Sequence, residues 1–426
     1  MIQEFKKINK VQGELKLPGD KSISHRAILF SAMADGESRI INLSGAGDLN
    51  STQECCRDLG VKFIYDKNDL VVSGKGIKNF TAPIKPLFAG NSGTTARLIT
   101  GLLACQDFKS IITGDSSLSK RPMQRIIDPL KEFGAELISS ENNTLPLTIS
   151  PSNNLKAINY TLPVASAQVK SGVLIAGLHL DEVTSVTEKN PSRNHTEKML
   201  GLRVEKSKQG IVSYSSKSNY PKPKEYFIPS DVSTAAFFIV LTLLSKNSFL
   251  TLRNVTLNES RTGYLEILKK MGASIEIENK VEKAGEEYGD LVVKSSKLSN
   301  IKIPGNLIPN IIDEIPILAV AGIFADGEFE ISNASELRTK ESDRIKTICE
   351  NLRLLDLTVD EKDDGFSIKG DIKNIKVEFQ CNDDHRIAMA FSVLSMLLEN
   401  GGKVNGIDCV KISNPGFLKQ VNRVAK

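Results

Sequence analysis

The sequence predicts an α/β protein of two domains, each built from three copies of one repeating unit. The chain has 426 residues, which is too long for one ordinary core and fits two or three domains. Six segments repeat one order: a short strand, a polar turn, an apolar helix, a second turn and a second strand. A polar, proline-bearing stretch at residues 217–227 separates the third segment from the fourth, so the six units divide into two domains of three.

The six segments share an apolar helical run with a strand on either side. Because these helices are apolar on nearly all faces, we expect them to be largely buried, with the sheets covering them. The segments are residues 13–43, 86–115, 159–189, 225–255, 301–334 and 376–408.

A second helix follows each of the first five units and tends to end at a glycine before another strand. Gly60, Gly134 and Gly272 hold this position, where a glycine is the expected helix C-cap. The fifth copy, ENLRLLDLTVD, lacks that glycine, and the sixth copy is cut short at the C-terminus.

Composition narrows the class of protein. Hydrophobic residues make up 40% and charged residues 25%, and 55 Lys and Arg against 51 Asp and Glu give a net charge of +4. Because positive and negative charges nearly balance, the protein is not expected to bind nucleic acid through its overall electrostatic field.

Six scattered cysteines predict reduced thiols, with neither a disulfide framework nor a zinc site. With no apolar run of membrane-spanning length and no leader-like N-terminus, we expect a cytoplasmic protein.

The N-terminal tips of the apolar helices carry groups that suit anions. Ser, Thr, Asn and Asp at these places are explained one at a time by helix capping. Basic residues in the first turns are not, since they oppose the helix dipole unless an anionic ligand binds there. Further basic residues begin the second helices. The tip and second-helix residues together include Lys21, Arg26, Arg97, Lys170, Arg386, Lys120, Arg121, Arg193, Arg338, Lys340 and Arg344, with carboxylates at Asp313, Glu314, Glu341, Asp383 and Asp384.

Seven ordered motifs then point to a family: PGDKSISHRA, AGNSGTTARL, SKRPM, ASAQVKSGVLIAGL, NPSRNHTEKML, KESDR and DDHRIAMA. With these motifs the chain resembles the 5-enolpyruvylshikimate-3-phosphate synthases over essentially its whole length. The resemblance implies a transferase of the shikimate pathway, which leads to chorismate and the aromatic amino acids. Such an enzyme moves the enolpyruvyl group of phosphoenolpyruvate to the 5-hydroxyl of shikimate 3-phosphate and releases phosphate.

The resemblance also implies the domain layout. The fold would be a two-domain inside-out α/β prism of six βαβαββ-type repeats, three per domain. Residues 21–227 would form the domain on the shikimate 3-phosphate side. Residues 1–20, which the pattern alone leaves with either domain, would join residues 228–426 in the second domain, with the active site in the cleft between the two.

Site residues follow from the resemblance position by position. Asp313 and Glu341 would be the acid/base pair, assisted by Lys21, with His385 nearby. Shikimate 3-phosphate would be bound by Lys21, Ser22, Arg26, Ser166, Gln168, Arg193, Asp313 and Lys340. Phosphoenolpyruvate would be bound by Lys21, Asn91, Gly93, Thr94, Arg121, Gln168, Arg344, Arg386 and Lys411.

Some of these assignments have alternatives. Asp313 would otherwise be a helix N-cap or first-turn carboxylate, and a structural histidine capping the helix is as favoured for His385 as a catalytic one. The family often has a lysine at the position where this chain has Ile412, and Lys411 lies one residue before it. Gly93 occupies the place where alanine is associated with tolerance of glyphosate, so we expect glyphosate to compete with phosphoenolpyruvate.

Two rival functions fit the sequence less well. The sister family that transfers enolpyruvyl to UDP-N-acetylglucosamine has a reactive cysteine in the loop that here reads GDSSLSKRP and has none. A nucleic-acid-binding module is disfavoured by 6% aromatic residues, no tryptophan and carboxylates at the tips. The expected partners are the two small-molecule substrates alone, with no metal, no organic cofactor, no nucleic acid and no membrane, and the expected state is a monomer.

Overall fold

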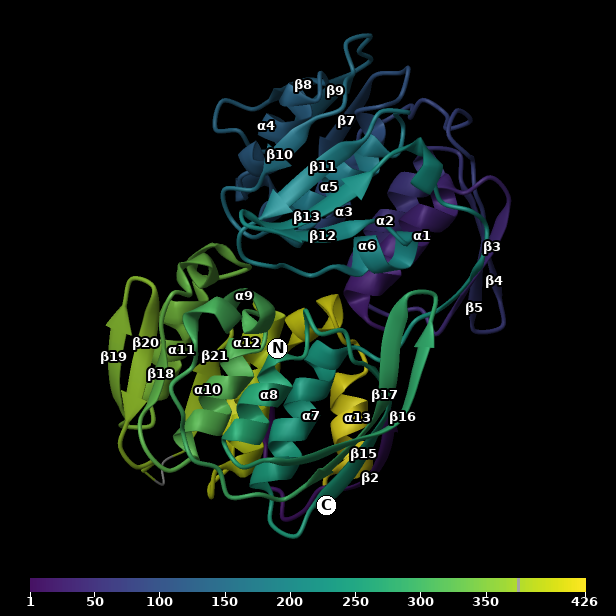
Figure 1. Ribbon diagram of the computed structural model, residues 1–426. Coiled ribbons are helices and arrows are strands. Elements are labelled where there is room, and N and C mark those ends of the chain that lie inside the picture. Colours follow the sequence, from purple (N-terminus) through teal and green to yellow (C-terminus); the bar gives the residue numbers. More distant parts are fainter. Residues whose placement is uncertain (374–375) are drawn as a thin grey trace. The chain divides into compact units, whose positions relative to one another are not determined.

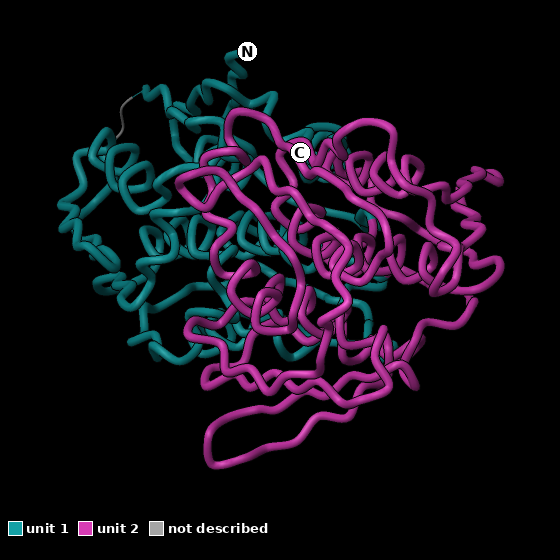
Figure 2. Tube along the Cα trace, turned by 90° about the horizontal axis from the view of Figure 1, so that it is seen from above, with its two compact units in different colours: residues 1–18, 229–281, 287–426 teal, residues 19–228, 282–286 magenta. Residues whose placement is uncertain are grey.

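The computed structural model describes residues 1–373 and 376–426, which divide into two compact units (Figure 2). Unit 1 comprises Met1–Pro18, Pro229–Val281 and Glu287–Lys426, and unit 2 comprises Gly19–Ile228 and Glu282–Glu286. The N-terminal segment therefore groups with the C-terminal half of the chain. Each unit has a hydrophobic core of its own.

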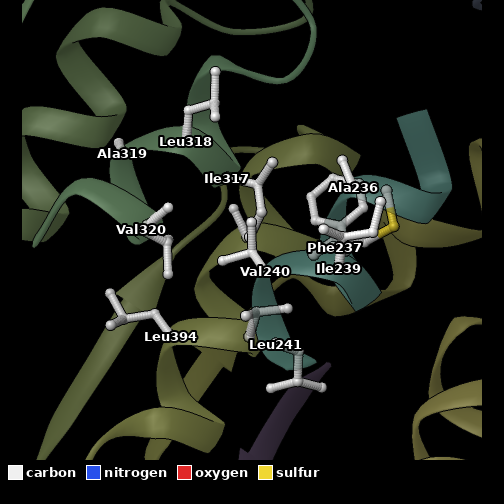
Figure 3. Packing of buried hydrophobic residues seen from close by; sticks show 14 of the residues in the cluster. Ala236, Phe237, Ile239, Val240, Leu241, Ile317, Leu318, Ala319, Val320 and Leu394 are labelled. Carbon is white, nitrogen blue, oxygen red and sulfur yellow. The ribbon is translucent and has the colours of Figure 1, made fainter. Parts of the chain in front are cut away.

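Three buried helices form the centre of unit 1: α7 (Val232–Leu244), α10 (Ile315–Ile323) and α12 (His385–Leu397). Each packs against the other two. Figure 3 shows Phe237 and Val240 of α7 among Ile317 and Val320 of α10 and Leu394 of α12. These helices are apolar all round because neighbours cover every side.

Three sheets accompany those helices. The first joins β16 (Ser274–Lys283), β17 (Glu286–Lys294), β15 (Phe249–Thr256) and β2 (Gln12–Lys16) in that order. The second joins β18 (Phe329–Ile331), β20 (Gly365–Lys369) and β19 (Thr358–Lys362), and the third joins β1 (Ile2–Phe5), β22 (Gly402–Asn405) and β21 (Val377–Gln380). Each sheet contacts one central helix, since β15 packs on α7, β18 on α10 and β22 on α12.

Unit 2 repeats this arrangement around α1 (Lys21–Met33), α3 (Gly93–Leu103) and α5 (Ala167–Gly177). Its sheets are β14 (Glu225–Phe227), β3 (Glu37–Ile41), β5 (Asp69–Ser73) and β4 (Lys62–Asp66); β6 (Leu87–Phe88), β7 (Ser110–Thr113), β9 (Leu147–Ser150) and β8 (Glu136–Ser139); and β10 (Asn159–Thr161), β11 (Thr184–Glu188), β13 (Gly210–Ser215) and β12 (Val204–Ser207). A Cβ on Gly101 of α3 would lie 2.1 Å from the carbonyl oxygen of Gly172 in α5. Glycine at 101 therefore lets the two helices approach closely.

The second helices follow the predicted positions. They are α2 (Asp48–Asp58), α4 (Gln124–Glu132), α6 (His195–Leu200), α8 (Gly263–Lys270) and α11 (Arg344–Arg353), labelled in Figure 1. Gly60, Gly134 and Gly272 have φ of +88°, +95° and +105°, so they are the left-handed C-cap residues that the sequence predicts. In the fifth copy Asp356 takes this role with φ of +63°.

The remaining helical segments are α9 (Ile308–Ile311) and α13 (Phe417–Val424), with the short turns η1 (Leu118–Lys120), η2 (Lys217–Asn219), η3 (Gly305–Leu307), η4 (Ser335–Thr339) and η5 (Ile407–Ile412). In the described part of the chain, no single helix has the length and apolarity to cross a membrane. The bent pair Gly305–Ile311 and Ile315–Ile323 meets the criterion by length and composition only. Its second helix is α10, which is buried in the core of unit 1.

Candidate active site

Five of the six central helices begin at a polar side chain that accepts a hydrogen bond from the first turn. The caps are Asp20, Ser92, Ser166, Asp231 and Asp384. Capping therefore accounts for these residues as the sequence suggests, while the basic and carboxylate residues beside them need another explanation. The sixth helix, α10, starts at Glu314 without such a bond.

The first turn of α1 gathers three predicted ligands of shikimate 3-phosphate. Lys21 is the first residue of the helix, and its Nζ lies 3.0 Å from Asp48 Oδ2. Arg193, just before α6, donates from Nη1 to Ser22 Oγ at 3.3 Å. Residues 21, 22 and 193, far apart in the sequence, thus meet at one helix N-terminus, which favours an anion.

Arg26, one turn further along α1, is almost fully buried. It donates from Nη1 to the Ser22 carbonyl at 3.0 Å, from Nε to Thr196 Oγ1 at 2.8 Å and from Nη2 to Ser171 Oγ at 2.8 Å. Burial and the nearby positive charge of Arg193 lower the pKa of Arg26 to about 10, so Arg26 remains a cation at neutral pH. Because its three hydrogen-bond partners are neutral, they do not compensate the positive charge of Arg26.

Lys170, a basic tip residue of α5, behaves differently. Its Nζ lies 2.5 Å from Glu188 Oε2 and 2.7 Å from Glu197 Oε1, and all three side chains are buried. Burial would lower the pKa of Lys170, but Glu197 and Glu188 raise it above its usual value. Two carboxylates therefore neutralise this lysine, which ties α5 to β11 and α6.

The second tip of unit 2 is held by Arg121. Its Nη2 donates to Asn91 Oδ1 at 2.8 Å, and Asn91 Nδ2 donates to Asp115 Oδ2 at 2.8 Å. Arg121 and Asn91, both predicted ligands of phosphoenolpyruvate, thus lie together although 30 residues separate them.

Arg97 lies beside three more predicted ligands of phosphoenolpyruvate, which are Gly93, Thr94 and Gln168. Its Nη1 donates to Gln168 Oε1 at 2.8 Å, and Gln168 Nε2 donates to Thr94 Oγ1 at 3.0 Å. Burial and the nearby charge of Arg121 lower the pKa of Arg97 to about 10. A Cβ on Gly93 would lie 2.6 Å from Arg97 Nη1. The sequence predicts Arg97 as a basic tip residue, and the resemblance assigns it no substrate.

Unit 1 holds the predicted acid/base pair. Arg344, the first residue of α11, donates from Nη1 to Asp313 Oδ1 at 3.2 Å and from Nη2 to Glu341 Oε2 at 2.6 Å. Its Nε donates to Asp384 Oδ2 at 2.7 Å. Burial would lower the pKa of Arg344, but the charges of Asp384, Glu341 and Asp313 raise it well above its usual value. One buried guanidinium thus positions three carboxylates.

Arg386 approaches the same carboxylate from α12. Its Nη2 lies 3.3 Å from Asp313 Oδ2, and its Nη1 lies 3.6 Å from Glu314 Oε1. Asp313 stands between α9 and α10, and the residue at the N-cap position of α10 is Glu314. The alternative of Asp313 as a helix N-cap is therefore wrong.

The remaining predicted residues of unit 1 are His385, Lys340 and Lys411. His385 is the buried first residue of α12, whose cap is Asp384, so the alternative of His385 as the cap is wrong too. Burial lowers the pKa of Lys340, and the charge of Asp313 opposes that shift. Lys411, in η5, is 71% exposed, and its Nζ pairs with Asp408 Oδ1 at 2.9 Å.

A family model supplies the comparison that decides the family. Residues 5–421 match the model described as EPSP synthase (3-phosphoshikimate 1-carboxyvinyltransferase). The chain belongs to the EPSP synthase family. A protein of Salinibacter ruber named 3-phosphoshikimate 1-carboxyvinyltransferase is 43% identical over 429 residues and covers 100% of both chains. One of the same name from Petrotoga mobilis is 42% identical over 97% of each chain.

Solved structures agree with this assignment. An EPSP synthase from Acinetobacter baumannii superposes with a TM-score of 0.88 at 38% identity, covering 100% of this chain and 98% of that one. The enolpyruvyl transferase NikO from Streptomyces tendae superposes with a TM-score of 0.78 at 13% identity and shows the fold alone. The predicted fold class is confirmed. The predicted reaction and its class, the enolpyruvyl transfer of the shikimate pathway by a transferase, are confirmed by family membership.

Proposed function

We propose that this chain transfers the enolpyruvyl group of phosphoenolpyruvate to shikimate 3-phosphate with the residues gathered in its two units. Unit 2 contributes most of the groups for shikimate 3-phosphate, around Ser22, Arg26 and Arg193. Both units contribute to phosphoenolpyruvate, through Arg121 and Gln168 in unit 2 and through Arg344 and Arg386 in unit 1. Both substrates are polyanions, so guanidinium groups are the side chains that suit them.

The reaction needs two separate proton carriers. Carbon 3 of phosphoenolpyruvate must gain a proton while the 5-hydroxyl of the acceptor loses one and attacks carbon 2. The resulting adduct then loses phosphate from carbon 2 and a proton from the former carbon 3, which restores the double bond. Each positioned proton carrier contributes about 10²–10⁴-fold to such a rate.

The observation that carries the assignment is the shared guanidinium of Arg344, which donates to both Asp313 and Glu341. It separates the two carboxylates and orients each of them. In this proposal Asp313 takes the proton of the acceptor hydroxyl, Glu341 serves the methylene carbon, and Lys21 assists the departing phosphate. His385 and Lys340 line the same part of unit 1, and Lys411 and Ser166 stay predicted contacts.

Phosphate release from phosphoenolpyruvate tests the choice of acceptor. Shikimate 3-phosphate and UDP-N-acetylglucosamine are offered in parallel, and release is expected only with shikimate 3-phosphate. Release only with the nucleotide sugar, or with neither acceptor, would contradict the proposal.

Three further expectations belong to this proposal. Glyphosate should inhibit by competing with phosphoenolpyruvate, because Gly93 leaves room beside the backbone near Gln168 and Arg97. A pattern of inhibition that phosphoenolpyruvate does not relieve would contradict it. The protein is expected to be cytoplasmic. It is also expected to be a monomer, which sedimentation or size-exclusion measurements of its mass would check.

A further inference from the structure

Two cysteines of unit 1 place their sulfur atoms 3.7 Å apart. Cys381 directly follows β21, and Cys409 lies in η5, 28 residues later. Their exposed fractions are 1% and 8%. All six cysteines of the chain are free thiols, so this contact joins two reduced sulfurs.

Gly406 makes room for the Cys381 sulfur. The strands β21 and β22 run parallel, with Gln380 paired to Asn405, so Cys381 and Gly406 follow at the same end of the sheet. A Cβ on Gly406 would lie 2.6 Å from Cys381 Sγ, and Gly406 has φ of +84°. Glycine at this position therefore allows the sulfur to lie where it does.

The two thiols are not equivalent. The contact between the two sulfurs lowers the pKa of Cys381, whereas that same contact, with burial, raises the pKa of Cys409. The thiolate is the reactive form of cysteine. A thiolate at either cysteine would have the second sulfur 3.7 Å away.

We propose that Cys381 and Cys409 form an oxidisable dithiol that a peroxide converts into an intramolecular disulfide. The thiolate of one cysteine attacks one oxygen of hydrogen peroxide, the O–O bond breaks, the departing hydroxide takes up the thiol proton, and a sulfenic acid and one water form. The sulfur of the other cysteine then attacks the sulfenic acid sulfur, the S–S bond forms, the S–O bond breaks, and a second water leaves. The two thiols lose two hydrogens, and the peroxide is reduced to two waters.

Closing the disulfide shortens the sulfur–sulfur distance by about 1.7 Å, because a disulfide bond is about 2.05 Å long. That movement acts on the segment that positions the arginines of unit 1. The N–H of Asp384 donates to the Cys381 carbonyl at 2.9 Å, and the Asp384 carboxylate holds Arg344. Between them, Asn382 and Asp383 have φ of +49° and +57°, so this turn has little conformational freedom.

The oxidised protein should therefore bind phosphoenolpyruvate less well, a consequence that rests on the proposed roles of Arg344 and Arg386. The disulfide itself does not depend on those roles. Mass and activity are consequently measured separately.

The mass experiment uses the full chain as it exists. Hydrogen peroxide is added and removed, the protein is denatured in N-ethylmaleimide, and the unreduced digest is analysed by mass spectrometry. The expected result is a peptide that joins Cys381 to Cys409, two hydrogens lighter than the separate thiol peptides and separated by dithiothreitol. Cys349, buried in α11 of the same unit, should be recovered as a labelled thiol. Recovery of Cys381 and Cys409 as labelled thiols, as sulfinic acids or in bonds to other cysteines would overturn the proposal.

The activity experiment follows phosphate release before oxidation, after it and after re-reduction. Wild-type protein should lose activity with the cross-link and regain it with dithiothreitol, while Cys409→Ser should keep its activity because it cannot form the bond. Cys349→Ser should respond as wild type does. A fully cross-linked protein with unchanged phosphoenolpyruvate KM would overturn the link to Arg344. An inactive reduced protein would instead count against the proposed function, and the mass result would be unaffected.

Discussion

Gly93 and Arg97 lie one helical turn apart in α3, and a Cβ at position 93 would come within 2.6 Å of Arg97 Nη1. Real Cβ contacts are essentially never this short, so the guanidinium must move when the glycine is replaced. Its 2.8 Å hydrogen bond to Gln168 Oε1 is the contact most directly affected. Through Gln168 the change reaches Thr94.

Gly93→Ala should therefore raise the KM for phosphoenolpyruvate, with a smaller effect on kcat and a larger loss of inhibition by glyphosate. The added methyl group takes space at the helix N-terminus and displaces a charged donor, so ligands at this place lose both room and a partner. Steady-state kinetics with each substrate varied in turn measures the change. An unchanged KM, or a KM shift accompanied by a large fall in melting temperature, would contradict this explanation.

Asp313→Asn should lower kcat by about 10²–10⁴-fold while substrate binding is mostly retained, because the amide keeps the shape of the carboxylate and cannot accept the proton. Single-turnover phosphate release gives the rate, and equilibrium binding of shikimate 3-phosphate gives the affinity. Glu330→Gln is the matched control, since Glu330 pairs with Lys362 on the surface of the same unit. Full turnover in Asp313→Asn would refute the assignment of the base.

The sequence predicts those structural features of this protein whose physical cause is local. Helix caps, apolar helical runs and glycines at helix ends depend on neighbouring residues only, so Ser92, Ser166 and Gly134 stand where the pattern places them. The order of strands is different. β2 precedes α1 in the chain but pairs with β15, while β14 pairs with β3, and no local pattern specifies that exchange.

The candidate site divides in the same way. The resemblance identifies Arg121, Arg344 and Asp313, yet their partners come from distant elements. Gln168 reaches Arg97 across 71 residues, and Asp384 reaches Arg344 across 40. Lys170 shows the reverse, because its position at a helix tip suggests an anion ligand while its contacts with Glu188 and Glu197 neutralise it. Charge compensation depends on tertiary contacts that spacing does not reveal.

Lys170→Met should destabilise unit 2 by about 3–5 kcal/mol, because it leaves two buried carboxylates without their cation. Chemical denaturation monitored by circular dichroism measures the loss. Lys217→Met is the control, as Lys217 and Asp181 form an exposed pair at 3.6 Å worth less than about 1 kcal/mol. Adding Glu188→Gln and Glu197→Gln to Lys170→Met should recover part of the stability. Equal losses for the two lysine variants would contradict the buried-triad interpretation.

Acid should destabilise the protein through His25. Burial lowers the pKa of this histidine from 6.5 to about 3 in the folded state, while the unfolded chain keeps the ordinary value. Below pH 6.5 the unfolded state therefore binds a proton that the folded state does not, and stability falls as the pH drops toward 3. At 1.36 kcal/mol per pH unit, the loss from this residue is about 2 kcal/mol at pH 5. His179, with its pKa lowered by burial to about 4, acts in the same direction.

The contribution of His25 can be isolated with His25→Asn, whose amide can accept or donate at the place of Nδ1, 2.7 Å from Thr52 Oγ1. Free energies of unfolding measured by urea at pH 7.5, 6.0 and 5.0 give the pH dependence for wild type and variant. The variant should be less stable at pH 7.5 but should lose less between pH 7.5 and pH 5.0, by about 2 kcal/mol. His179→Asn should remove a separate share of the same dependence. Parallel pH profiles for wild type and His25→Asn would show that this histidine is protonated in the folded state as easily as in the unfolded one.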